Sequence, residues 1–212
     1  MQRMRRRLPL LVGLLAMALV AMACGAEGAL PPQQPASTPC ASNCPPLVGY
    51  NSPMKLLSTD HFSFYYSTPP WTVDSQDSDS ATLLHDSDYG QISAQFFAVS
   101  VRSGTSADAL LSSWTRANLD TSQFAGLEDM GPVNGAEIGY VRGAGEQYAA
   151  LVNQPNAPNI PIYIQIMAST QGTSGIIFAA VSPLDPLKPD PTNPRQVRSH
   201  AYDQLINTLT WL

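Results

Sequence analysis

Acidic side chains gather in one stretch of the chain, where they could act as hard oxygen ligands. Five aspartates lie between positions 74 and 88 with no lysine or arginine among them: Asp74, Asp77, Asp79, Asp86 and Asp88. Oxygen ligands at this density suit calcium. The glycine-containing loop and the later glutamate of a calcium-binding hand are missing, and acidic strand connections are commonly solvated. A calcium site and a solvent-exposed acidic surface are therefore the two hypotheses for this cluster.

The side chains that most enzymes use for catalysis are sparse. The histidines His61, His85 and His200 are widely separated, and no pair has the spacing of metal ligands on a helix. No serine lies in a Gly-x-Ser-x-Gly motif, and the segment 172–175 is typical of a hairpin turn. We therefore expect a protein that is not an enzyme, with no catalytic residue and no cofactor.

The amino terminus has the pattern of an export signal. Arg3 and the run Arg5-Arg6-Arg7 form a basic start, and sixteen apolar or small residues follow from Leu8 to Ala23. This apolar segment is shorter than the roughly 18 to 20 residues that cross a bilayer. A basic start, a short apolar core and small residues at its end predict a secretory signal. The arginine run also partly resembles a twin-arginine signal, so the export route stays open.

The end of this segment, Ala21-Met22-Ala23-Cys24, resembles the lipobox of bacterial lipoproteins. The resemblance implies cleavage after Ala23 and a diacylglyceryl group on the Cys24 thiol, which makes residues 1–23 the signal peptide. A second acyl chain on the new amino terminus would make the anchor stable. We therefore expect a lipid-anchored protein on the extracytoplasmic face of the cell membrane. A conventionally cleaved secreted form and an uncleaved short anchor are the alternatives for the same pattern.

Two further cysteines, Cys40 and Cys44, are separated by three residues and followed by Pro45. Outside the cytoplasm, two thiols at this spacing are expected to form a disulfide that closes a small loop. The segment Cys-x-x-x-Cys-Pro also resembles the copper-binding motif of the Sco family, which implies Cu(I) held by two thiolates. The disulfide is the favoured prediction, and metal binding is the alternative.

Residues 24–54 are rich in proline, alanine, serine and glutamine, with prolines at positions 31, 32, 35, 39, 45 and 46. Such a segment can bury too little apolar area to offset its chain entropy. Polyproline-like chain rises ~3.1 Å per residue. We therefore expect a lipidated, disordered tether that holds a folded domain away from the membrane.

Cleavage of the signal makes the protein more acidic. Four of the eleven basic residues precede position 24, while all sixteen acidic residues follow it, so the net charge becomes 7 − 16 = −9. Nucleic acids and anionic lipid headgroups bind basic surfaces. Neither is therefore expected as a partner.

Residues 55–212 are long enough for one domain with its own core. The pattern of apolar residues predicts strands at 61–66, 81–85, 92–101, 136–141, 146–152, 160–168 and 175–181. It also predicts two helices. The first covers residues 105–120 and begins in a capping box of Thr105 and Asp108, and the second runs from Pro194 to about Leu209. In the segment 92–101 the apolar residues change from even-numbered to odd-numbered positions, which indicates a bulge or burial of both faces of the strand. Short links with glycine, among them Gly143-Ala144-Gly145, are read as turns between antiparallel neighbours. The fold class is therefore α+β, an antiparallel sheet packed with helices.

Two short end motifs point to a known family. Phe62-Ser63-Phe64-Tyr65-Tyr66 is followed by Pro69-Pro70-Trp71, and the closing motif is Ala201-Tyr202-Asp203-Gln204-Leu205-Ile206-Asn207-Thr208-Leu209-Thr210-Trp211. With the order of the elements, these motifs resemble the PsbP/Mog-like superfamily and its bacterial lipoprotein relatives. The resemblance implies an α/β/α sandwich around an antiparallel sheet, used for binding or assembly and without a shared catalytic motif.

Together these features predict a membrane-anchored, extracytoplasmic lipoprotein with a non-catalytic domain that binds or assembles with a protein or a small ligand. The alternative is a metal-handling protein for copper or calcium, or an enzyme, built on Cys40 and Cys44 or on the cluster Asp74 to Asp88.

Overall fold

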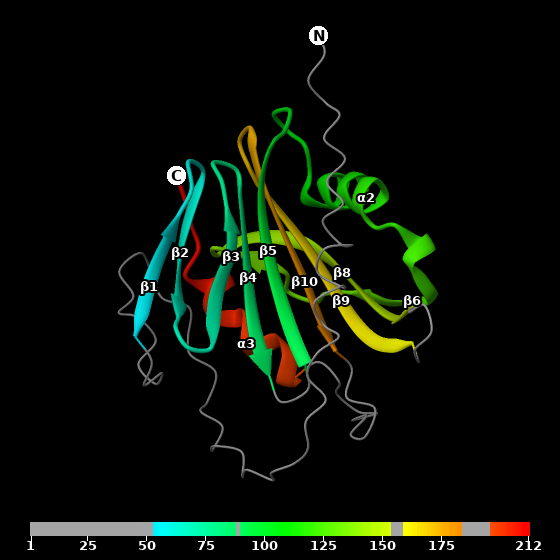
Figure 1. Ribbon diagram of the computed structural model, residues 1–212. Coiled ribbons are helices and arrows are strands. Elements are labelled where there is room, and N and C mark those ends of the chain that lie inside the picture. Colours follow the sequence, from blue (N-terminus) through cyan, green and yellow to red (C-terminus); the bar gives the residue numbers. More distant parts are fainter. Residues whose placement is uncertain (1–52, 88–89, 154–158, 184–195) are drawn as a thin grey trace. The chain divides into compact units, whose positions relative to one another are not determined.

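The computed structural model describes residues 53–87, 90–153, 159–183 and 196–212, and residues 49–212 form one compact unit (Figure 1). Cys24, Cys40, Cys44 and Asp88 lie outside the described residues, so the lipid and disulfide predictions stay predictions. Within the described residues, no helix is both long and apolar enough to cross a membrane.

Two antiparallel sheets make up most of the domain. The large sheet has the order β3 (Trp71–Gln76), β4 (Ser80–Ser87), β5 (Gly90–Ser100), β10 (Ser174–Pro183), β9 (Ile160–Gln171), β8 (Val141–Val152) and β6 (Phe124–Pro132), and the short β7 (Glu137–Ile138) pairs with β8. The small sheet has the order β1 (Met54–Ser58), β2 (Phe62–Ser67) and β11 (Thr210–Trp211). The helices are α2 (Ala107–Asn118), the single turn η1 (Thr121–Gln123) and α3 (Gln196–Asn207). The predicted antiparallel sheet is confirmed, and the described domain is mostly β.

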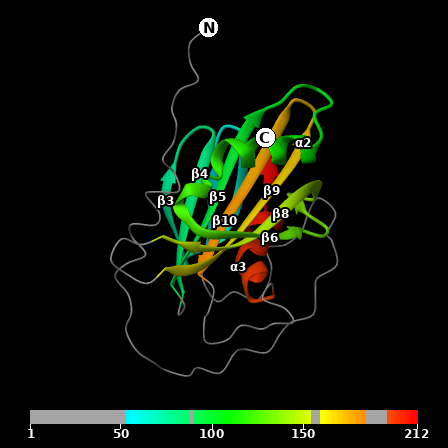
Figure 2. The same cartoon turned by 90° about the vertical axis from the view of Figure 1, so that its right-hand side faces the viewer.

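The helices α2 and α3 lie on opposite faces of the large sheet. Successive side chains of a strand point to opposite faces. Tyr202 of α3 packs on Phe178, and Phe178 is opposite Phe96 in the register of β5 and β10. Trp114 of α2 packs instead on Phe97, the next residue of β5. Figures 1 and 2 show the two helices at different ends of the domain as well.

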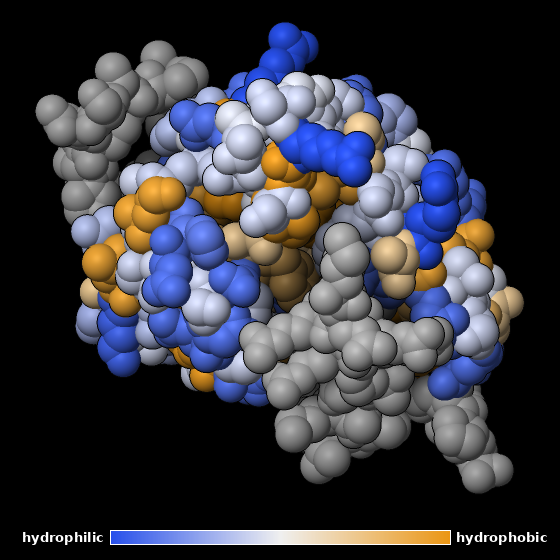
Figure 3. Space-filling model, turned by 90° about the horizontal axis from the view of Figure 1, so that it is seen from above, coloured by the Kyte–Doolittle hydropathy of each residue, from blue (hydrophilic) through white to orange (hydrophobic). Residues whose placement is uncertain are grey.

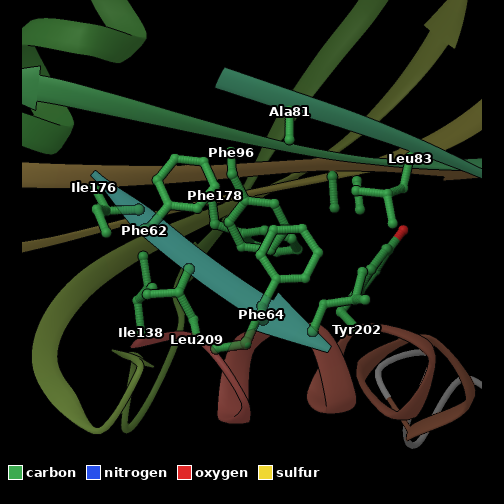
Figure 4. Packing of buried hydrophobic residues seen from close by; sticks show 14 of the residues in the cluster. Phe62, Phe64, Ala81, Leu83, Phe96, Ile138, Ile176, Phe178, Tyr202 and Leu209 are labelled. Carbon is green, nitrogen blue, oxygen red and sulfur yellow. The ribbon is translucent and has the colours of Figure 1, made fainter. Parts of the chain in front are cut away.

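The main hydrophobic core lies between the large sheet and the layer formed by the small sheet and α3. Phe62 and Phe64 of β2 point at the large sheet, with ring centroids 6.0 and 4.6 Å from that of Phe96 (Figure 4). Burial of such aromatic side chains stabilises the fold by roughly 1.5 to 3 kcal/mol each. The end of the molecule seen in Figure 3 has hydrophobic residues inside a central hollow and hydrophilic residues around it.

The carboxyl terminus is joined to the core by several hydrogen bonds. The Thr208 hydroxyl accepts a hydrogen bond from the Tyr65 backbone N–H at 3.0 Å, and the Trp211 indole N–H donates to the Ile138 carbonyl at 3.2 Å. β11 pairs with β2, so α3 ends at Asn207 and Leu209 is not helical. The prediction that the last helix continues to Leu209 is therefore wrong.

The segment Gly143-Ala144-Gly145 is not a turn but lies inside the long strand β8. A Cβ atom at Gly143 would collide with the Ala168 carbonyl, and one at Gly145 would lie 2.8 Å from the Val133 side chain. The glycines therefore allow close approach of the neighbouring chain. The predicted strand 136–141 is divided by a turn at Gly139 and Tyr140, both at positive φ.

The strands β3 and β6 are absent from the sequence-based prediction. The predicted capping box of α2 also differs from the structure. The cap is Ser106, whose hydroxyl accepts a hydrogen bond from the Ala109 N–H at 3.2 Å. The Thr105 carbonyl instead accepts from the Thr170 hydroxyl at 3.1 Å. β5 pairs regularly with both neighbouring strands, and its residues 93–96 are all buried. Burial of both faces of the strand therefore explains why its apolar residues change from even to odd positions.

Candidate functional site

The aspartates weighed as calcium ligands are spread over different places in the part of the chain that the structure describes, which leaves out Asp88. Asp77 and Asp79 lie in the turn before β4, and Asp86 lies near the far end of that strand, about 20 Å away at the usual strand rise. Asp86 accepts a hydrogen bond from the Gln91 amide at 3.1 Å. Among the described residues, no three histidine, cysteine or carboxylate side chains form a metal-binding group. Asp74 is exposed on β3.

Asp77 has a structural role in the β3–β4 turn. Its Oδ1 accepts hydrogen bonds from the backbone N–H groups of Asp79 and Ser80 at 2.8 and 2.7 Å. The bond from Asp79 is the main cause that lowers the pKa of Asp77, and slight burial opposes it. A carboxylate satisfied in this way closes a turn.

His61 and Asp79 join the two sheets at the surface. The His61 Nε2 lies 3.1 Å from the Asp79 Oδ1, and both side chains are more than half exposed. The Gln76 amide also donates to the Ser58 carbonyl at 2.7 Å. These contacts hold the β1–β2 turn beside the β3–β4 turn. The position of His200 falls in α3, but its side chain is outside the described residues.

His85 lies in a different environment, on the face of the large sheet that α3 covers. Its ring centroid is 5.2 Å from that of Trp71 in an edge-on arrangement, and Trp71 in turn lies 6.2 Å from Tyr202. Burial is the main cause that lowers the pKa of His85, and the nearby Asp86 opposes this shift only in part. The imidazole is therefore neutral at pH 7. Its Nδ1 is buried and has no hydrogen-bond partner among the described residues.

Four more polar side chains share this face. In β10, Ser182 is four residues from the core residue Phe178 and so points to the same face of the sheet. It is opposite Tyr163 of β9. Gln165 of β9 is opposite Gln147 of β8. Residues directly opposite one another in a sheet point to the same side. We call this set the polar band: His85, Ser182, Tyr163, Gln165 and Gln147.

The part of the polar band on β8 and β9 is hydrogen-bonded internally. The Tyr163 hydroxyl donates to the Gln147 Oε1, and the Gln147 amide donates to the Pro132 carbonyl at 3.0 Å. The Gln165 amide contacts the Met167 sulfur at 3.1 Å. Tyr163 and Gln147 are each 3% exposed. These bonds fix the orientation of two buried polar groups.

Ser182 differs from its neighbours in the band. It is 2% exposed, and its hydroxyl has no hydrogen-bond partner among the described residues. A buried polar group left without a partner costs about 1 to 3 kcal/mol. Tyr202 lies beside it, since the Tyr202 hydroxyl lies 3.4 Å from the carbonyl oxygen of Val181. Figure 4 shows this hydroxyl directed at the large sheet.

The polar band can donate and accept hydrogen bonds, but it offers no charge. His85 is neutral, and the other four members carry no ionisable carboxyl or amine. Among the described residues, the Ser182 hydroxyl makes no hydrogen bond, so it is not paired with His85 as a nucleophile with its base. The described geometry thus places hydrogen-bonding groups beside the buried rings of Trp71 and Tyr202, which are 2% and 1% exposed.

The sequence contains one signal for this polar band. Tyr163 and Gln165 fall at alternate positions of an otherwise apolar strand, and Gln147 lies in the neighbouring predicted strand. Polar residues at inward positions of adjacent strands indicate a buried polar site. Recognising this required the pairing of β8 with β9 and the choice of the inward face, which one strand alone does not provide.

Comparisons with known proteins identify the fold. No family model matches the chain, and neither does any curated protein. Among solved structures, the Ran-binding protein Mog1p of Saccharomyces cerevisiae matches with a TM-score of 0.51 and 4% identity over 76% of this chain and 96% of Mog1p. Cyanobacterial PsbP of Synechocystis matches with a TM-score of 0.47 and 10% identity over 81% of this chain and 98% of that chain. A protein of Bacteroides thetaiotaomicron matches with a TM-score of 0.45 and 13% identity over 73% of this chain, which spans 47% of that protein. The likeness to Mog1p, at 4% identity, shows a similar fold, and it agrees with the fold that the sequence predicts.

Proposed function

We propose that the protein is a membrane-anchored, extracytoplasmic lipoprotein whose folded domain is a non-catalytic binding module. The polar band is its ligand site. The observation that carries this proposal is a pair of buried polar atoms, the His85 Nδ1 and the Ser182 Oγ, next to the aromatic rings of Trp71 and Tyr202. Neither atom has a hydrogen-bond partner in the part of the chain that the structure describes. A ligand that supplied one acceptor and one donor would satisfy both atoms.

An uncharged small molecule fits this site better than an ion. No charged side chain belongs to the polar band, and burial of an isolated charge there would be costly. Mog1p is described as a Ran-binding protein. A protein partner elsewhere on the domain is compatible with this fold, so the binding module could serve a protein as well as a small ligand.

The anchor part of the proposal rests on the amino-terminal sequence. The lipobox-like segment that ends at Cys24 and the proline-rich segment after it support a lipidated tether. Mass spectrometry of the protein from its native membrane tests this directly. A diacylglyceryl group on Cys24 is expected, and an unmodified Cys24 would refute the lipid anchor.

The ligand site can be tested with two probes of the same shape. Benzamide is neutral, and benzoate carries a carboxylate. With the chain from residue 24 carrying Cys24→Ser, we expect benzamide to shift the NMR signals of residues in β4, β9 and β10 around the polar band. Benzoate should shift them at least about tenfold less at equal concentration, since its charge would be buried without a partner.

Ser182→Ala should weaken the response to benzamide by removing one hydrogen-bonding group. Ser169→Ala is the matched control, because Ser169 is buried on the same face but its hydroxyl already donates to the Val141 carbonyl at 2.9 Å. If both variants respond like the parent, or if benzoate binds as well as benzamide, the polar band is not a site for neutral ligands.

A further inference from the structure

Exposed apolar side chains gather around the small sheet. Among the described residues, six large hydrophobic side chains are exposed, and four of these belong to this sheet or border it. We call these four the outer patch: Leu56, Tyr65, Tyr140 and Leu212. Leu56 and Tyr65 are directly opposite in the register of β1 and β2, and they are 56% and 45% exposed. Phe64, the residue before Tyr65, points into the core, so this exposed pair lies on the outer face of the sheet.

Tyr140 borders the small sheet from the turn between β7 and β8. The Gly139 N–H donates to the Ile206 carbonyl at 3.0 Å, which holds this turn at the end of α3. Thr208 follows α3 directly, and its hydroxyl accepts a hydrogen bond from the Tyr65 N–H at 3.0 Å. Tyr65 and Tyr140 therefore lie beside the same short stretch of chain.

The backbone of Tyr140 is strained. Its φ is 61°, in the left-handed region that favours glycine and asparagine and where a bulky side chain is rare. The side chain is 50% exposed, so packing within the domain offsets little of this strain. Strained residues that the fold does not require are found at functional sites. A contact outside the domain would explain why a tyrosine occupies this position.

The outer face of the small sheet is uncharged. Besides Leu56 and Tyr65, its exposed or half-buried positions are Met54, Ser58, Ser63 and Thr210. The protein as a whole is acidic, with a formal net charge of −5, and the exposed carboxylates of Asp74 and Glu128 lie on the large sheet. Copies of an acidic protein repel one another where such carboxylates meet. The outer face offers a surface on which two copies can meet without this repulsion.

We propose that a second copy of this chain packs on the outer patch through a twofold contact. In such a contact the same surface meets itself, so each of the four side chains is buried in both copies. Two sheets that pack face to face lie about 10 Å apart with interdigitating side chains, which suits the pair of Leu56 and Tyr65. Tyrosine is also enriched at protein interfaces.

The size of the patch predicts a weak dimer. At the usual strand rise and spacing, three strands of at most six residues cover roughly 300 Å². A standard interface buries about 800 Å² on each partner. Tyr140 and Leu212 extend the patch but leave it below this size. The dimer should therefore be reversible and dissociate in the micromolar range.

A weak contact is sufficient if the protein is anchored. If Cys24 carries the lipid anchor, as proposed above, all copies are held at one membrane, which raises their effective concentration. The contact itself requires neither the anchor nor the polar band. It can therefore be tested on the unanchored chain, and its failure is distinct from a failure of the proposed function.

Analytical ultracentrifugation tests the dimer. The sample is the chain from residue 24 with Cys24→Ser, kept in a reductant so that Cys40 and Cys44 cannot link two copies. Over concentrations from about 1 to 300 µM, the weight-average mass should rise from that of one copy toward twice that value. A mass that stays at that of one copy over the whole range would overturn the proposal.

The double variant Leu56→Ser, Tyr65→Ser locates the contact. It should weaken association at least about tenfold, since each change acts in both copies. Val73→Ser and Leu151→Ser are the matched controls, because both residues are exposed apolar positions on strands of the large sheet. Circular dichroism checks that each variant is folded. Association that is unchanged in the double variant, or that the controls weaken equally, would overturn the proposal.

Tyr140→Gly separates a contact from a structural role. Glycine accepts the positive φ, so the melting temperature should equal or exceed that of the parent. Association should nevertheless weaken at least about threefold, because an exposed ring of the patch is lost. A purely structural residue would change the melting temperature and leave association unaffected. Parental association in this variant would therefore overturn the patch as proposed.

Discussion

The face of the large sheet beneath α3 has two halves that are built from the same strands and differ in chemistry. In one half, Phe96 packs on the ring of Phe64 in the small sheet and on Phe178 of the neighbouring strand. In the other half, four residues along β10 from Phe178, the inward position is Ser182 and its neighbours are Tyr163 and Gln147. The first half stabilises the fold. The second half contains two buried polar atoms, the His85 Nδ1 and the Ser182 Oγ, that have no hydrogen-bond partner among the described residues, as expected if this half is the proposed ligand site.

The apolar half should therefore tolerate truncation least. Phe96 is fully buried, and its ring lies 4.6 to 6.0 Å from those of Phe64, Phe178 and Phe62. Phe96→Ala should lower the free energy of unfolding by about 3 to 5 kcal/mol, because it removes apolar contacts and leaves a cavity. Urea denaturation followed by circular dichroism measures this. A loss below about 1 kcal/mol would contradict the assignment of this half as the stabilising one.

The next largest effect is expected where β8 approaches β9 most closely. Gly143→Ala would place a methyl group against the Ala168 carbonyl, which is backbone and cannot rotate away. We expect a loss of about 1 to 3 kcal/mol from overpacking. Gly126→Ala in β6 is the control, since nothing lies within 4 Å of a Cβ atom there. Equal melting temperatures for the two variants would show that this approach is not tight.

The contrast between the two halves also explains what the sequence could and could not predict. The alternation of Phe62, Phe64 and Tyr66 predicted β2. The helical spacing of Leu110, Leu111 and Trp114 predicted α2. In both cases the periodicity of apolar residues within a single segment was enough to identify the element. β3 was missed because five of its six residues are exposed, so it lacks an alternating pattern. Gly143 and Gly145 were misread because a glycine required by the neighbouring strand looks like a turn residue when that strand is not known. The polar band depends on the register of four strands and for the same reason could not be assembled from single segments.

Within the polar band, a satisfied hydrogen bond should matter more than an unsatisfied group. Tyr163→Phe removes the donor to the Gln147 Oε1 and leaves that buried oxygen without it. The expected loss in unfolding free energy is about 1 to 3 kcal/mol, measured by urea denaturation. Gln147→Leu in the same background should add little further loss if the two residues act as a pair, and strictly additive losses would show that they act separately.

The neutral state of His85 predicts a pH dependence of stability. Because burial lowers its pKa in the folded protein below the unfolded value of about 6.5, the unfolded chain binds a proton first as the pH falls. Stability should therefore decrease as the pH drops below about 6.5, and the decrease should level off below the folded pKa. Melting temperatures measured between pH 8 and pH 5 should show a smaller decrease in His85→Gln than in the parent. Identical slopes in His85→Gln and the parent would place His85 in contact with solvent.

The smallest change in stability is expected for Ser182→Ala. Unlike Tyr163, Ser182 makes no hydrogen bond among the described residues, so its removal breaks none and relieves the cost of a buried hydroxyl. The variant should be as stable as the parent or more stable, by up to about 1 kcal/mol, although it binds benzamide more weakly. Stability and binding then change in opposite directions at one residue, which neither a core position such as Phe96 nor an inert surface position would show. A clear loss of stability in Ser182→Ala would mean that the hydroxyl already has a partner within the chain, and the distinction between the two halves of the sheet would then lie in composition alone.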